Sequence, residues 1–181
     1  MRISACNTVA LIVDYQEKLL PAMSNLENLM ENSKKLILGL KELGIPMIVT
    51  EQYSKGLGHT VKEITDCMGD SYKPYEKLTF SGICTDEIRE AVKAFGKENI
   101  LVCGVEAHVC VLQSVIDLKE EGYNVFLVED CIASRKTNDK ETAVARAMGE
   151  GAFVTSVEAA LFEMTYGAGT PHFKAISKIV K

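Results

Sequence analysis

The chain has 181 residues, of which 47% are hydrophobic and 25% charged, so it has neither the composition of a disordered protein nor the small size that requires disulfides. Lys and Arg number 20 and Asp and Glu 25, a formal charge of −5, which argues against nucleic acid or an anionic membrane as the main partner. Without a signal-peptide pattern or an apolar stretch of roughly 20 residues, we expect a cytoplasmic protein with one domain, residues 1–181.

Apolar runs and helical periods alternate along the first part of the chain. Residues 8–14, TVALIVD, form a continuous apolar run that ends in a carboxylate, which predicts a buried parallel strand. A helical period over residues 25–43 and a second apolar run over 45–51 follow. The polar, glycine-containing segment 52–71 is predicted to be a long loop, and loops of this length are often functional.

The same alternation continues to the end of the sequence. Strands are predicted at residues 72–77, 99–104, 124–130 and 152–156, and helices at 86–95, 108–121, 138–149, 156–164 and 172–180. This pattern predicts a single-domain, three-layer α/β/α Rossmann-like fold with a six-stranded, mostly parallel sheet.

Ligands of such sheets bind beyond the carboxyl ends of the strands, so the residues at those ends are the candidates for chemistry. They are Asp14, Glu51 and Gln52, the segment 104–110, and Asp130. Six cysteines are present, without a CxxC pair or a metal-binding spacing with the three histidines, so the question is whether one of them differs from a small buried hydrophobe.

Cys110 follows the strand 99–104 and lies in the first turns of the predicted helix 108–121. The positive end of a helix dipole is expected to lower the pKa of a thiol from about 8.5 toward neutral pH, and N–H groups there can hold an oxyanion. A buried structural cysteine is an equally good interpretation of the position alone.

Asp14 and Lys77 are candidates to activate this thiol. Asp14 ends an apolar strand, where a carboxylate either moves protons or anchors a loop or helix. Lys77 serves chemistry only if it turns inward beside Asp14 and the sulfur, since most lysines are solvated surface charges. Residue spacing does not decide between these interpretations.

The remaining candidates are residues that would line a pocket. His108 lies two residues before Cys110, and positions i and i+2 of a helix do not face each other, so we do not expect a Cys/His dyad. Core, loop or surface packing is the alternative for each candidate in this group, which comprises Gln16, Gln52, Tyr53, Phe80 and His108.

Three segments of the chain resemble the isochorismatase-like cysteine hydrolase superfamily: VALIVDYQEKLLPAM at 9–23, KLTFSGIC at 77–84, and the block 101–135 that begins LVCGVEAHVCVLQ. The last is the most specific, because it fixes a strand, a turn and a cysteine at set offsets. Residues 50–64, 104–113 and the C-terminal tail further resemble the isochorismatase domain-containing subgroup.

The resemblance implies a catalytic triad of Asp14, Lys77 and Cys110 that acts on a small-molecule amide, or a related C–N bond, through a cysteine thioester. It also implies a non-proline cis peptide at Val105–Glu106, with the N–H groups of Glu106 and Cys110 directed at one oxyanion, and a homo-oligomer. A catalytically silent binding or scaffold protein, a vinyl-ether hydrolase and a redox-active thiol protein are the alternatives.

Nicotinamidases of this superfamily carry a metal site formed by an Asp-x-His and a further His after the second strand. Here that stretch reads TEQYSKGLGHT, with His59 isolated. We therefore expect no metal and no cofactor, and nicotinamide is not the expected substrate.

Overall fold

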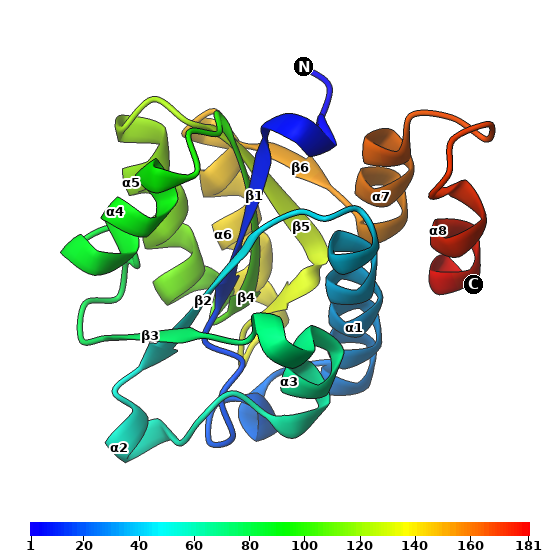
Figure 1. The fold of residues 1–181 in the computed structure, drawn as a ribbon. Coiled ribbons are helices and arrows are strands. Elements are labelled where there is room, and N and C mark those ends of the chain that lie inside the picture. The colour runs from blue at the N-terminus through cyan, green and yellow to red at the C-terminus, as the bar shows by residue number, and fades with distance from the viewer.

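The computed structural model describes residues 1–181, and its centre is one six-stranded sheet (Figure 1). The strands are β1 (Thr8–Val13), β2 (Met47–Gln52), β3 (Pro74–Lys77), β4 (Asn99–Val105), β5 (Asn124–Ala133) and β6 (Phe153–Thr155). Their order is β3-β2-β1-β4-β5-β6, and every neighbouring pair is parallel. The predicted α/β fold is confirmed, with a sheet that is wholly rather than mostly parallel.

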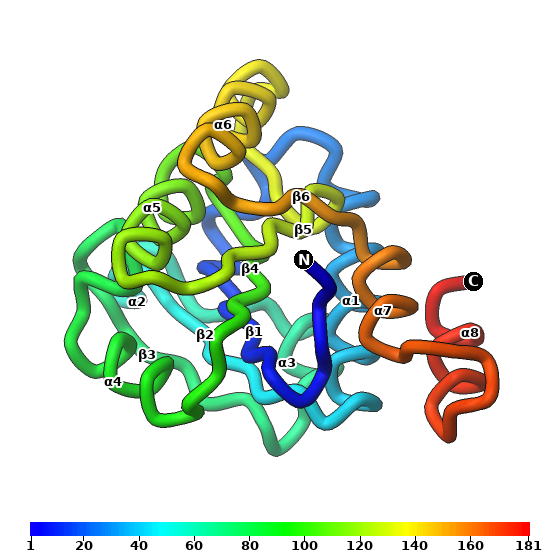
Figure 2. The backbone as a smooth tube through the Cα atoms, turned by 90° about the horizontal axis from the view of Figure 1, so that it is seen from above, coloured from blue at the N-terminus to red at the C-terminus, as the bar shows by residue number.

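Helices cover both faces of the sheet. They are α1 (Leu26–Glu42), α2 (Ser54–Leu57), α3 (Lys62–Met68), α4 (Asp86–Ala94), α5 (Leu112–Glu120), α6 (Thr137–Gly149), α7 (Val157–Thr165) and α8 (Phe173–Val180). Figure 2 shows α1, α3, α7 and α8 on one side of the strands and α4, α5 and α6 on the other. None of the helices is long and apolar enough to cross a membrane.

Burial on both faces explains why the strands are continuous apolar runs. All six residues of β1 are buried, and because successive side chains of a strand point to opposite faces, they divide between two cores. Ala10 and Ile12 pack with α1, whereas Leu11 and Val13 belong to the cluster on the side of α5.

The segment 52–71 differs from its prediction as a long loop. It contains the short helices α2 and α3 and a 3₁₀ turn, Gly69–Ser71. Helices of four and seven residues are too short to show a helical period against a polar background. Main-chain hydrogen bonds from Glu17 to His59 and from Val61 to Tyr15 fasten this segment to the chain that follows β1.

The order of the strands places a topological switch point between β1 and β4, where ligands of doubly wound sheets bind. The two strands approach closely there. Gly104 has φ +130°, and a Cβ at this position would lie 2.0 Å from the carbonyl oxygen of Val13. Only glycine fits this point, directly before Asp14 on one strand and the Cys110 turn on the other.

Candidate active site

Asp14 is the first residue beyond β1 and is fully buried. Its φ of 53° is unusual for a residue other than glycine, and such backbone is concentrated at functional sites. Both carboxylate oxygens have partners: the Thr50 hydroxyl donates to Oδ1 at 2.6 Å and the Lys77 ammonium to Oδ2 at 2.7 Å. Thr50 was not among the predicted site residues, although it pairs in register with Val13, so the alignment of strand ends is the signal that would have found it.

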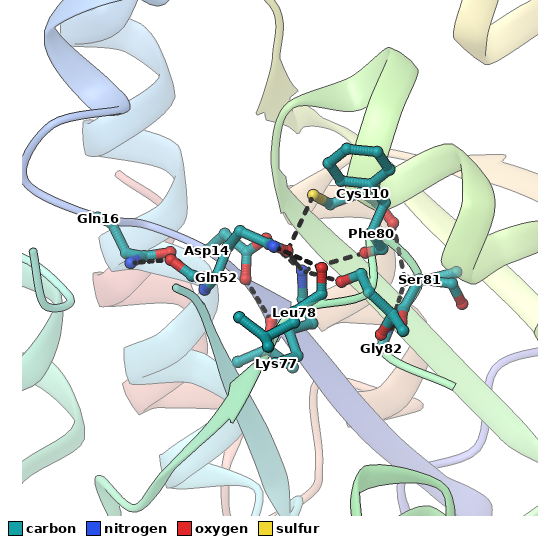
Figure 3. A network of polar contacts seen from close by, with 12 residues as sticks. Asp14, Gln16, Gln52, Lys77, Leu78, Phe80, Ser81, Gly82 and Cys110 are labelled. Carbon is teal, nitrogen blue, oxygen red and sulfur yellow. Dashed lines mark hydrogen bonds and ion pairs between the residues drawn. The ribbon is translucent and has the colours of Figure 1, made fainter. Parts of the chain in front are cut away.

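Lys77 is the last residue of β3, an edge strand, yet its side chain is turned inward and has no exposed surface. Its ammonium donates to Asp14 Oδ2 and Gln52 Oε1, each at 2.7 Å, and to the Phe80 carbonyl at 3.0 Å (Figure 3). The geometry is the one that a chemical role requires and that a solvated surface lysine would not have.

Cys110 lies in a turn of π-helix, Ala107–Val111, that precedes α5, and not in the first turns of an α-helix as expected. Single π-turns within helices are frequent at functional sites. The residue is 6% exposed, and its sulfur lies 4.0 Å from Gln52 Oε1.

The expected lowering of the thiol pKa is wrong. Burial and the charge of Asp14 raise the pKa of Cys110 to about 12, against the opposing effect of the Lys77 ammonium. Loss of hydration and a neighbouring carboxylate therefore outweigh the nearby ammonium, and the thiol is neutral in the resting protein. A neutral thiol needs a base to remove its proton before it can act as a nucleophile, and Asp14 is the carboxylate that acts on this sulfur.

The turn between β4 and Cys110 contains a cis peptide bond at Val105–Glu106. The Glu106 N–H has no protein acceptor, whereas the Glu106 carboxylate accepts from the main chain and the Nε of Arg135, at 3.3 and 3.0 Å. A main-chain donor without a partner, one turn before the sulfur, is available to an oxygen anion. Arg135, which fixes this carboxylate, was not predicted.

The predicted pocket residues fall in different places. Gln16 is fully buried, and its amide binds the main chain of Gln52 and Gly58, so it supports the end of β2 and is not a pocket surface. His108 is engaged through Nδ1 with the Ser134 hydroxyl at 2.9 Å. Tyr53 lines a cavity of about 570 Å³ together with Lys77. The exposed ring of Phe80 stands beside Cys110 in Figure 3.

Glu51 and Asp130, the other two carboxylates at strand ends, serve the framework. Burial opposes ionisation of Glu51, but hydrogen bonds from Tyr72, Thr60 and His59 outweigh it and leave the pKa of Glu51 lowered. Asp130 accepts from the main-chain N–H of Val157 at the start of α7. The chain holds no group of three or more His, Cys, Asp or Glu side chains placed to bind a metal ion.

Comparison with known proteins points to one family. The Isochorismatase domain model matches residues 8–159. Isochorismatase domain-containing protein 2 of Danio rerio is 34% identical, over 99% of this chain and 89% of its own length. The solved structure of MAR1 ribonuclease from Caenorhabditis elegans is 35% identical, has a TM-score of 0.94, and covers 99% of this chain and 92% of its own.

A more distant structural neighbour shares the fold. The YcaC gene product of Escherichia coli, described as an octameric hydrolase of unknown specificity, is 24% identical with a TM-score of 0.88, over 93% of this chain and 84% of its own.

Proposed function

Because this chain belongs to the isochorismatase family, we propose that it is a cysteine hydrolase that cleaves a small-molecule amide, or a related C–N bond, through a thioester on Cys110. In this proposal Asp14 carries protons and Lys77 balances charge.

One observation carries the proposal: a buried lysine and a buried aspartate form an ion pair of 2.7 Å beside a buried thiol. Removing two charges from water is costly and is poor evidence for stability, so a pair that converges on a nucleophile calls for a chemical explanation. The thiol contributes a proton, the carboxylate can accept it, and the ammonium stabilises the thiolate that remains.

The reaction follows from these positions. The Cys110 proton moves to Asp14 as the sulfur attacks the carbonyl carbon of the substrate, and the Glu106 N–H donates to the oxyanion. Asp14 then protonates the nitrogen of the leaving group, the C–N bond breaks, and an acyl thioester remains. Water gives a proton to Asp14 and attacks the thioester, which releases a carboxylic acid, and the sulfur regains its proton from Asp14.

Three other activities are distinguishable from this one. A vinyl-ether hydrolase would use acid chemistry and would tolerate loss of the sulfur, and a binding protein would release no product. RNA cleavage, suggested by the name of the C. elegans relative, is disfavoured by the net charge of −5.

The test is a panel of primary amides, N-carbamoyl compounds and ureides, with released ammonia or amine measured for the wild type and for Cys110→Ser. We expect release by the wild type, a loss of at least about a hundredfold in Cys110→Ser, and an acyl adduct on the Cys110 peptide by mass spectrometry. Cys84→Ser is the matched control, because that thiol is exposed and lies outside the triad. Release that persists in Cys110→Ser refutes the nucleophile, and RNA in the same panel tests the ribonuclease activity.

We also propose that the chain forms a homo-oligomer. Three large apolar side chains near the site are exposed, Leu78 by 74%, Phe80 by 54% and Tyr53 by 50%. Leu78 and Tyr53 line the same cavity, and exposed apolar surface often marks an interface. Sedimentation velocity at micromolar concentration is expected to show an oligomer that Leu78→Asp weakens. Phe95→Asp, a change at another exposed apolar residue, is expected to leave the oligomer intact, and a wild-type monomer would contradict the proposal.

A further inference from the structure

The Lys77 ammonium has three protons and uses all of them in the resting site. They go to Asp14 Oδ2, to Gln52 Oε1, and to the carbonyls of Phe80 and, at the longer distance of 3.4 Å, Thr79. Asp14 is the ion-pair partner and the two carbonyls belong to the main chain, so the side-chain oxygen of Gln52 is the neutral acceptor that a thiolate at Cys110 can displace from Lys77.

The side chain of Gln52 is fixed in the orientation that makes this competition effective. Its Nε2 donates to the Leu78 carbonyl at 2.9 Å, so its oxygen faces the ammonium and the sulfur. Its main chain is held on both sides by Gln16, whose Oε1 accepts from the Gln52 N–H at 2.7 Å and whose Nε2 donates to the Gln52 carbonyl at 2.9 Å. Leu78, Lys77 and Gln16 together thus fix the orientation of Gln52 shown in Figure 3.

We propose that Gln52 is a positioning residue that keeps the Cys110 thiol protonated at rest, by occupying the Lys77 N–H that a thiolate would take and by presenting its own carbonyl oxygen to the sulfur. A neutral oxygen accepts weakly from a thiol but repels a thiolate, so it favours the protonated form. The charged groups that act on the sulfur are Asp14, from the end of β1, and Lys77, from β3. This inference rests on the proposed function for its biological meaning, although its test does not need a substrate.

The experiment measures the rate of iodoacetamide labelling of the Cys110 peptide between pH 6 and 11, by mass spectrometry, in the wild type and in Gln52→Met. Methionine fills similar space without a carbonyl. Because the wild-type thiol has a pKa of about 12, its labelling rate rises about tenfold with each pH unit in this range. We expect the Gln52→Met profile to lie at least about one pH unit lower, with about tenfold faster labelling at pH 8. Gln52→Glu, which adds a carboxylate, is expected to move the profile to higher pH, with slower labelling at every pH measured.

Two further variants keep the test decisive. Gln113→Met removes an exposed amide of α5 that takes no part in the network, and its profile is expected to match the wild type. Gln52→Asn keeps the amide but withdraws the oxygen by one methylene, so a smaller downward shift is expected even if Gln52→Met folds poorly. If the labelling profiles of both Gln52→Met and Gln52→Asn stay within about 0.3 pH unit of the wild-type profile, or move to higher pH (a threshold of roughly the size such profiles resolve), the inference is overturned.

The two proposals fail separately. Amide release that survives in Cys110→Ser removes the proposed reaction and leaves the labelling result standing. Release that needs Cys110, together with an unmoved labelling profile in the Gln52 variants, removes the role of Gln52 alone.

Discussion

A single substitution in the Lys77–Asp14 pair is expected to cost much stability, because both side chains are buried and solvent does not reach them to replace a lost partner. We predict that Lys77→Met lowers the free energy of unfolding by about 3–5 kcal/mol, since it leaves a carboxylate buried without its counter-ion. Urea denaturation followed by circular dichroism measures this change.

The double variant Asp14→Asn/Lys77→Met supplies the control. Asparagine tolerates positive φ and still accepts a hydrogen bond from Thr50, so no unpaired charge remains. We expect it to lose less than half as much stability as Lys77→Met, with strongly non-additive costs. Equal losses in the single and double variants would show that packing, and not the uncompensated charge, sets the stability of this site.

At the scale of residues, sequence position marked Asp14, Lys77 and Cys110 as candidates without deciding their roles, and the resemblance then implied a triad. In the structure the three lie together. Gln52 was predicted only as a strand-end and pocket residue and Thr50 was not predicted, and the roles of both show what a sequence does not reveal. Their roles depend on which atom of which neighbour lies within 3 Å, and that distance follows from strand register and side-chain rotamers. The prediction of a lowered pKa for the Cys110 thiol was wrong for the same reason, because the burial that raises this pKa is a property of the folded site.

The short elements after β2 are joined to the sheet by the Glu51–His59 contact of 3.0 Å. Hydrogen bonding to Glu51 raises the pKa of His59 above its usual 6.5, so the contribution of His59 to stability is full below pH 6.5 and is lost as the pH rises through the raised value. The pKa of Glu51 is lowered, so its effect on stability runs in the opposite direction. The contribution of Glu51 to stability is full above about pH 4.5 and is lost as the pH falls through the lowered value.

We therefore predict that the contact stabilises the fold most between about pH 4.5 and 6.5. His59→Asn should be less stable than the wild type at pH 6, and the difference should shrink by pH 9, when the wild-type histidine is neutral. Urea midpoints measured at intervals across this range test the prediction. A difference between the two proteins that is constant with pH would mean that the histidine contributes only packing.

Long helices and strands were predictable, because burial of one or two of their faces requires apolar residues at regular positions over many residues. Helix α1 and strands β1 and β4 fall within a few residues of their predicted limits. Helix α2 has no buried residue and α3 buries only Ile64 and Met68, so neither helix is long enough to show such a period. Strand β5 runs on to Ala133 past an irregularity in its pairing with β4, which residue type alone did not indicate.

The whole molecule is built on two hydrophobic cores that share one sheet. Leu40 of α1 and Leu118 of α5 are both fully buried, one in each core. The strands between them contribute alternate residues to both cores, so neither core can be lost while the other keeps its sheet. We therefore propose that residues 1–181 unfold as a single cooperative domain.

Leu40→Ala and Leu118→Ala test this proposal. Each substitution is expected to cost about 2–5 kcal/mol through lost contacts and a cavity, and the costs should add to within about 0.5 kcal/mol in the double variant because the sheet separates the sites. Circular dichroism reports the helices and tyrosine fluorescence reports the tertiary packing, and the two unfolding curves should coincide in every variant. A single substitution that splits the transition, moving one probe and leaving the other in place, would mean that the two faces of the sheet unfold independently.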